Sequence, residues 1–328
     1  IDATNVYVYE EDVQALMDAF DGLQILYNPE KTYVKFEDPE VQRVLAERFG
    51  DGRGTTRKQL EDVTELRFEF QRNTQVKSFN DMGEKLPNVR TLALNAFYGC
   101  SALESIDLSR VETLEGQLFT GCTSLKSVAL STVTAIGQAC FNGCSSLTSV
   151  KWGKIDAIPE RCFEHCAGLE EFSAPNVTYV ANSAFEGCSS LRKVELPLVS
   201  TLEREVFYNC SSLQTLSLPS LKTIVGSSTN KDIFTGSAIQ EASFETLEYV
   251  QANLFEGVKT LVSVDLPSAK TIGALAFKGC TQLTSVNMPV VTEVQRFAFN
   301  NCGTLTSLSM EEVTKIEGYA FQASGLQS

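Results

Sequence analysis

Apolar residues recur along most of this chain with a period of 22 residues. Phenylalanine marks the period at Phe97, Phe119, Phe141, Phe163, Phe185 and Phe207, and the series resumes at Phe234, Phe255, Phe277, Phe299 and Phe321. Written out, the unit is F-x-G-C-x-x-L-x-x-V-x-L-P-x-V-x-x-I, followed by four more residues. A fixed period of about 20–29 residues with regularly spaced leucine predicts a solenoid, in which each unit buries its apolar face against its neighbours.

The apolar positions inside one unit predict where its strand lies. In Leu125-x-x-Val128-x-Leu130 the last two residues alternate as a strand does. Several units place a proline directly after this strand, which ends it because proline cannot donate to a ladder: Pro175, Pro197, Pro219, Pro267 and Pro289. A second apolar pair, Val133-x-x-Ile136, lies on the return leg. The predicted fold class is therefore an α/β-type leucine-rich repeat solenoid, with a parallel concave β-sheet and a convex side of loops and short turns.

Residues 1–62 do not repeat and predict a small N-terminal helical cap. Their apolar and capping residues indicate a first helix over 13–20 that ends at Asp21-Gly22, a short strand at 32–36, a second helix between Asp38 and Gly50, and a third that begins at a capping box of Thr56 and Gln59. A cap is expected here because an uncapped solenoid would leave its first apolar layer in water.

Residues 63–328 predict the solenoid itself. Val63-x-x-Leu66-x-Phe68 and Val89-x-x-Leu92-x-Leu94 look like shortened strand cores of two irregular first repeats, which extend to about residue 96. Regular 22-residue repeats run from Phe97, and the last one is incomplete. The unit between Ile224 and Phe234 is five residues longer, which predicts a polar surface loop.

The ten cysteines follow the repeat rather than a disulfide framework. Eight lie three residues after the repeat Phe, while Cys140 and Cys162 directly precede it, in columns that suit small buried apolar residues. Ser237, Val258 and Ser324 replace cysteine without a matching loss elsewhere, which favours free thiols, although bridges between neighbouring repeats about 5 Å apart stay open. One cysteine per repeat makes a ladder and not a tetrahedral cluster, so we expect no metal site and no cofactor.

Other candidate residues for chemistry fit structural roles. His165, the only histidine, occupies a column otherwise filled by Gly and Asn, the residue set of a left-handed turn. Without another histidine, Ser–His and Cys–His arrangements lack a base, and chance pairs are certain among 41 acidic residues, so we predict no enzyme. Trp152 replaces Leu in an inward strand column and is interpreted as core. The turn at 49–54 resembles the start of a calcium loop, but Phe49 and Arg53 stand where oxygen ligands belong.

Charge narrows the choice of partner. The net charge of −14 argues against nucleic acid and anionic membrane surfaces, which need clustered Lys and Arg. No apolar run approaches the roughly 18–20 residues that span a bilayer. The chain starts at Ile1 without a signal-like segment and shows no C-terminal cap, so we expect a mature or trimmed form whose last repeat continues or packs against something.

The unit FNGCSSLTSV…LP…V..I…AF resembles the BspA-type leucine-rich repeats of bacterial surface proteins, over about residues 63–326. The N-terminal helices resemble the leader segment that precedes such repeats in gut Bacteroidetes proteins. The resemblance implies an exported, extracellular protein at the cell surface, in many members held by a lipid anchor, which here would lie outside this sequence. It also implies adhesion to host matrix proteins or to other cells, and it supplies no catalytic residues.

The solvent-facing columns of the predicted strands form the candidate binding face, since a solenoid usually binds on its concave side. The ligand-binding residues we predict on it are Lys151, Glu171, Lys193, Glu195, Glu241 and Asp265. The partner is an extracellular matrix or surface protein of a host, or a glycan, with no nucleic acid. The alternative is a structural spacer or self-associating module of a larger surface protein, which predicts dimers at high concentration.

Overall fold

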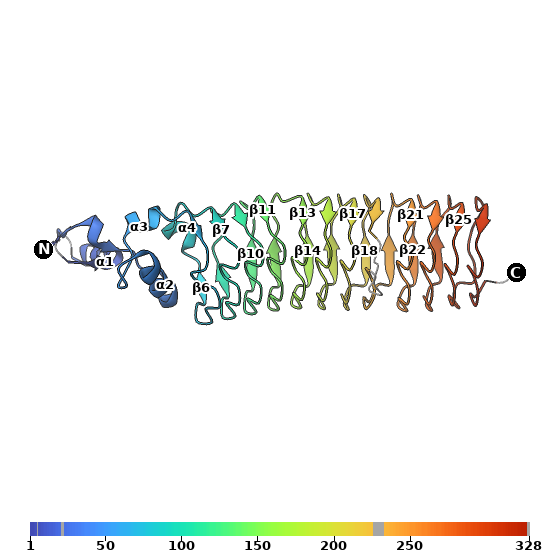
Figure 1. Ribbon diagram of the computed structural model, residues 1–328, viewed down its shortest axis with the longest axis horizontal. Helices are drawn as coiled ribbons and strands as arrows, with labels where there is room; N and C mark the ends of the chain where they lie inside the picture. The colour runs from blue at the N-terminus through green and yellow to red at the C-terminus, as the bar shows by residue number, and fades with distance from the viewer. Residues whose placement is uncertain (5, 21–22, 226–232, 327–328) are drawn as a thin grey trace.

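The computed structural model describes residues 1–4, 6–20, 23–225 and 233–326. These residues form an elongated molecule, with helices at the N-terminal end and repeats stacked in a row towards the C-terminal end (Figure 1). The helix end expected at Asp21-Gly22 and most of the loop expected between Ile224 and Phe234 lie outside the described residues.

The N-terminal segment combines helices with short parallel strand pairs, β1 with β3 and β2 with β4. Its elements are β1 (Asp2–Ala3), β2 (Val8–Tyr9), α1 (Glu10–Ala19), β3 (Leu26–Tyr27), the 3₁₀ turn η1 (Pro29–Lys31), β4 (Thr32–Tyr33), α2 (Pro39–Phe49) and α3 (Arg57–Glu61). A further short helix, α4 (Met82–Lys85), lies between the first strands of the solenoid.

The second and third helices have their predicted starts. The Asp38 carboxylate caps α2 by accepting from two backbone N–H groups of its first turn, and Pro39 is the first helical residue. Thr56 and Gln59 form the expected reciprocal capping box of α3. The strand expected at 32–36 is shorter, as β4 holds only Thr32–Tyr33.

The first helix differs from the expected one. It begins at Glu10, three residues before the apolar spacing starts, and Val13 is its one buried residue. Leu16 and Phe20 are exposed, at 47% and 60%. The helix is therefore present where helical spacing predicts one, but only part of its apolar spacing is buried.

Most repeats contribute one strand to each of two rows of parallel strands. The first row is β6 (Ser78–Phe79), β8 (Ser105–Ile106), β10 (Ser127–Ala129), β12 (Ser149–Lys151), β14 (Glu171–Ser173), β16 (Lys193–Glu195), β18 (Thr215–Ser217), β20 (Glu241–Ser243), β22 (Ser263–Asp265) and β24 (Ser285–Asn287). The second row is β5 (Glu65–Leu66), β7 (Thr91–Leu92), β9 (Thr113–Leu114), β11 (Ala135–Ile136), β13 (Ala157–Ile158), β15 (Tyr179–Val180), β17 (Thr201–Leu202), β19 (Thr223–Ile224), β21 (Tyr249–Val250), β23 (Thr271–Ile272), β25 (Glu293–Val294) and β26 (Lys315–Ile316). Between the rows lie turns and loops, so the predicted fold class is confirmed.

The register shows that one sequence interpretation was wrong. The strand cores expected at 63–68 and 89–94 belong to the second row, because Leu66 pairs with Leu92 and Leu92 with Leu114. Phe68 and Leu94, the last residues of these two expected strand cores, are exposed at 61% and 46%. Both legs of the unit hold two apolar residues three positions apart, and only pairing with neighbouring strands tells the legs apart.

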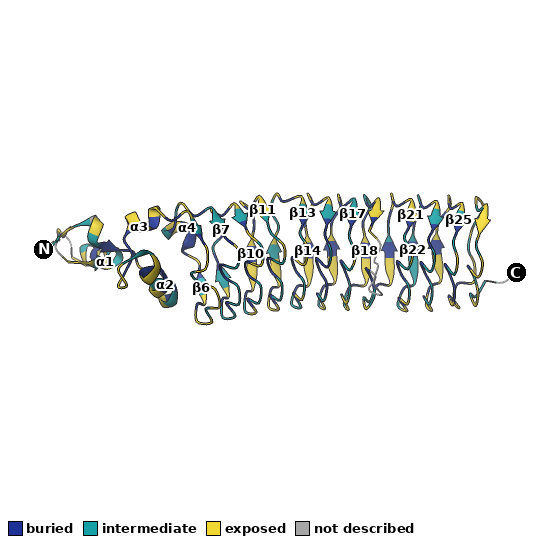
Figure 2. Cartoon of the chain, in the orientation of Figure 1, coloured by how far each residue is buried: buried dark blue, intermediate teal, exposed yellow. Residues whose placement is uncertain are grey.

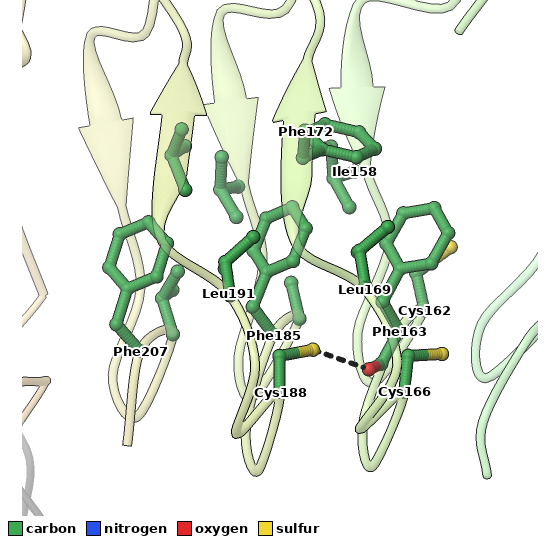
Figure 3. Packing of buried hydrophobic residues seen from close by; sticks show 14 of the residues in the cluster. Ile158, Cys162, Phe163, Cys166, Leu169, Phe172, Phe185, Cys188, Leu191 and Phe207 are labelled. Carbon is green, nitrogen blue, oxygen red and sulfur yellow. Dashed lines mark hydrogen bonds between the residues drawn. The ribbon is translucent and has the colours of Figure 1, made fainter. Parts of the chain in front are cut away.

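The repeat phenylalanines form a continuous spine in the core between the two rows (Figure 3). From Phe70 through Phe97 to Phe321, successive rings stack with centroids 4.9–6.2 Å apart. Trp152 packs on this core as expected, with its ring against Phe163 and Phe172 and its Nε1 donating to the Ile155 carbonyl at 2.9 Å. The spine makes one continuous core along the solenoid.

All ten cysteines are buried and free, which agrees with the interpretation as free thiols and not with bridges between neighbouring repeats. Each thiol three residues after a repeat Phe donates to the carbonyl of the Phe one unit earlier, as Cys188 does to Phe163 at 3.1 Å (Figure 3). Burial raises the pKa of the Cys162 and Cys166 thiols well above the usual range. Thiols buried in this way stay neutral and are not poised as nucleophiles.

Candidate functional site

The candidate binding face is the exposed side of the first-row strands. The three-residue strands bury their middle residue, except that Val150 of β12 is half-buried, and they turn the other two outward, as Figure 2 shows by the alternation of colours. In β14 the middle residue is Phe172, and the register places Glu171 beside Lys193 and Ser173 beside Glu195. This pleat brings the six predicted residues onto one face: Lys151, Glu171, Lys193, Glu195, Glu241 and Asp265.

The face is hollowed over the strands β14 to β24. A groove of about 900 Å³ has Lys193, Glu195, Glu241 and Asp265 among its lining residues. A smaller hollow of about 560 Å³ beside it is lined by Glu171 and shares Lys193 and Glu195. Lys151 is not among the lining residues of either hollow. The structure therefore gathers four of the six residues at one groove.

A local exchange of side-chain size lies under the groove. Ala242 is the buried middle residue of β20, where β18 has Leu216 and β22 has Val264. Two positions later Phe244 is fully buried in the column of Leu218 and so fills the core from below. This swap of a small and a large residue between two adjacent inward columns is visible in the sequence, and it places a small side chain in the lining of the groove.

The charges on the face differ in how far they are already paired. Lys193 Nζ lies 2.7 Å from Glu195 Oε1, and this hydrogen bond lowers the pKa of the Glu195 carboxyl and raises that of the Lys193 ammonium. Asp265 Oδ1 accepts from Asn287 Nδ2 at 2.6 Å, a contact that the sequence analysis did not predict. The Glu241 carboxylate has no hydrogen-bond or ion-pair partner among the described residues, and it is exposed.

His165 and the turn at 49–54 have structural roles. His165 has φ +59°, the left-handed backbone expected of its column. The Asp51 carboxylate in the turn at 49–54 accepts from the N–H groups of Arg53 and Gly54 and from the Tyr33 hydroxyl. Within the described residues, no group of three or more His, Cys, Asp or Glu side chains is placed to hold a metal ion. None of the helices in that part of the chain has the length and apolar composition to span a bilayer.

Stacked parallel strands in two rows, a phenylalanine spine and a hollowed strand face define the class of the protein, a leucine-rich repeat solenoid. The family model "BspA type Leucine rich repeat region" matches residues 68–175, 156–268 and 227–328. The chain therefore belongs to the BspA-type leucine-rich repeat family. Solenoids of this class are generally binding proteins and not enzymes.

A search of solved structures matches this chain to bacterial proteins. A leucine-rich repeat protein from Bacteroides ovatus is 25% identical, with a TM-score of 0.55 over 80% of this chain and 80% of that one. A leucine-rich repeat protein from Eubacterium ventriosum is 19% identical, with a TM-score of 0.46 over 83% of this chain and 85% of that one. A leucine rich cell surface protein from Faecalibacterium prausnitzii is 22% identical, with a TM-score of 0.40 over 79% and 74%. Comparison with curated proteins finds no match.

Proposed function

We propose that this chain is a non-catalytic binding protein of a bacterial cell surface, which attaches to a host matrix or surface protein, or to a glycan, through the first-row face. The observation that carries the proposal is the groove of about 900 Å³ that runs over neighbouring strands from β14 to β24. Because each repeat adds one strand to the groove, a long ligand contacts several repeats at once. Membership in the BspA-type family supports the surface location.

The residues proposed to bind are the six predicted from the sequence, and we expect them to differ in how directly they contact the ligand. Lys193, Glu195, Glu241 and Asp265 line the groove and are expected to contact the ligand directly. Glu171 lines the adjoining hollow, and Lys151 lies beyond it on the same face. We expect both to act at the edge, where exposed charges change association rates more than affinity.

The test uses two exchanges of a charge pair with equal composition. Lys193→Glu with Glu195→Lys reverses the pair on the groove. Lys270→Glu with Glu248→Lys reverses another exposed pair, 2.8 Å apart, outside the groove. Binding to immobilised matrix proteins and host glycans is measured for both variants and the parent chain. We expect at least one ligand to bind the Lys193/Glu195 exchange at least about tenfold more weakly than the parent chain, and to bind the Lys270/Glu248 exchange as the parent does. Equal binding by all three would move the site off this face.

The alternative, a self-associating spacer, draws on a different observation. The last described strand of the second row, β26, leaves Ile316 exposed at 53%, and Tyr319 just after the strand is exposed at 59%. If these residues pair two copies, sedimentation shows dimers at high concentration that Ile316→Ser with Tyr319→Ser abolishes. Monomers at every concentration would leave this alternative without support.

A further inference from the structure

We infer that the groove over β14–β24 takes an extended protein segment and seats one of its lysine or arginine side chains on Glu241. The inference rests on the proposed function and names the ligand class of that same site. It follows from the charge of the groove, from the lack of a partner for Glu241 among the described residues, and from the length and lining of the groove.

The charge of the groove favours a cation. Its lining holds one lysine against three carboxylates, and Lys193 is already neutralised by Glu195 at 2.7 Å. Asp265 is partly satisfied by the Asn287 amide. Glu241 remains as the carboxylate without a described partner near the middle of the strand series, so a cationic group of the ligand is its natural complement.

The strands beside Glu241 add acceptors for the same cation. The register places Thr215 on one side of Glu241 and Ser263 on the other, each about 4.8 Å away along the row. An ammonium or guanidinium group over Glu241 can donate to the carboxylate and to a hydroxyl oxygen of either neighbour. A charge-assisted hydrogen bond of this kind is about twice as strong as one between neutral groups.

The dimensions and lining of the groove favour a polypeptide over a sugar chain. Five strand spacings separate β14 from β24, which is about 24 Å, or about seven residues of extended chain. None of the described lining residues is aromatic, whereas a flat sugar ring is best covered by an aromatic face. Ser217, Ala242 and Ser243 make a low floor along which a backbone can approach closely.

The experiment selects ligands from a displayed library of random nonapeptides with the intact chain and three variants. The parent should enrich peptides with a central Lys or Arg, Glu241→Gln should bind the selected peptides at least about tenfold more weakly, and Glu241→Lys should enrich Asp or Glu instead. Glu248→Lys is the matched control, because it makes the same change of charge in the same repeat outside the groove and should keep the parent's preference. Circular dichroism confirms that each variant is folded.

The outcomes separate this inference from the broader function. A basic preference that survives Glu241→Lys, or a parent that enriches neutral or acidic peptides, overturns the inference. A parent that enriches no peptide but binds a glycan, with loss in the Lys193/Glu195 exchange, overturns the inference and keeps the proposed function. A parent chain that binds no peptide, no glycan and no matrix protein overturns the proposed function as well as the inference.

Discussion

At the scale of single residues, the repeat constrains side chains by column. The aromatic ring of Phe185 stacks on Phe163 at 5.5 Å and on Phe207 at 5.7 Å, and no part of it reaches solvent. Phe68 has the same side chain but lies at an exposed position. A phenylalanine therefore contributes to the free energy of unfolding in one column of the repeat and very little in another.

We predict that Phe185→Ala lowers the free energy of unfolding by about 3–5 kcal/mol, because it removes a buried ring and leaves a cavity between two stacked neighbours. Phe68→Ala should change it by less than about 0.5 kcal/mol. Urea unfolding followed by circular dichroism measures both. Similar losses in the two variants would contradict the spine as a main source of stability.

Two tyrosine hydroxyls face carboxylates in the structure. Burial and a hydrogen bond to Asp51 raise the pKa of Tyr33 to about 12, and a hydrogen bond to Glu203 together with burial raises that of Tyr179 to about 12. Because these acids hold their protons longer in the folded chain, their contribution to stability is complete below about pH 10 and is lost as the pH rises to about 12.

We predict that an alkaline titration read at the tyrosinate absorbance shows a late phase near pH 12 in the folded chain. Tyr33→Phe and Tyr179→Phe should each remove part of that phase, and denaturant should move it to about pH 10. A late phase that neither substitution reduces would show that these hydroxyls are not paired as described.

At the scale of elements, one carboxylate joins the N-terminal helices to the solenoid. Asp38 Oδ1 caps α2, while Asp38 Oδ2 accepts from the Lys77 N–H at 2.7 Å and the Ser78 N–H at 3.0 Å, at the start of β6. Asp38 itself is buried. The two oxygens thus fix the helix to the first strand of the first row.

We predict that Asp38→Ala costs about 2 kcal/mol or more, since it removes a cap and leaves two backbone donors beside β6 without a partner. Thr56→Ala removes only the capping box of α3 and should cost about 1 kcal/mol. Hydrogen exchange should rise at α2 and at 77–79 together in the first variant, and near α3 alone in the second. Independent exchange at α2 and β6 in the first variant would argue against the link.

At the scale of the whole molecule, the repeats contact only their neighbours along one axis (Figure 1). The solenoid is therefore expected to open first near an end, where a repeat has one neighbour fewer. The reactivity of the cysteines reports local opening along the solenoid, because buried thiols are spread from Cys100 to Cys302.

We predict that a thiol reagent labels none of the cysteines quickly in the native chain and all ten after denaturation. At intermediate denaturant, Cys302 and Cys280 should react before Cys144 and Cys166, as read by mass spectrometry of the labelled peptides. Uniform labelling would indicate that the solenoid opens as a single cooperative unit.

The sequence by itself determined the features that repeat. The column of phenylalanines, the small buried cysteines and the outward positions of Lys193, Glu195 and Glu241 all follow from a 22-residue period combined with the two-residue period of a strand. The caps of α2 and α3 could also be predicted, because each depends on residues only a few positions apart.

Only the tertiary structure decided what depends on pairing between distant segments. The assignment of 63–68 and 89–94 to the second row required the register with β9, since both legs of the unit share an apolar spacing. The groove, with the small Ala242 in its lining, is a property of six neighbouring strands together. Local periodicity specifies which side chains face inward, whereas the shape of a surface depends on how neighbouring repeats fill the space beneath it.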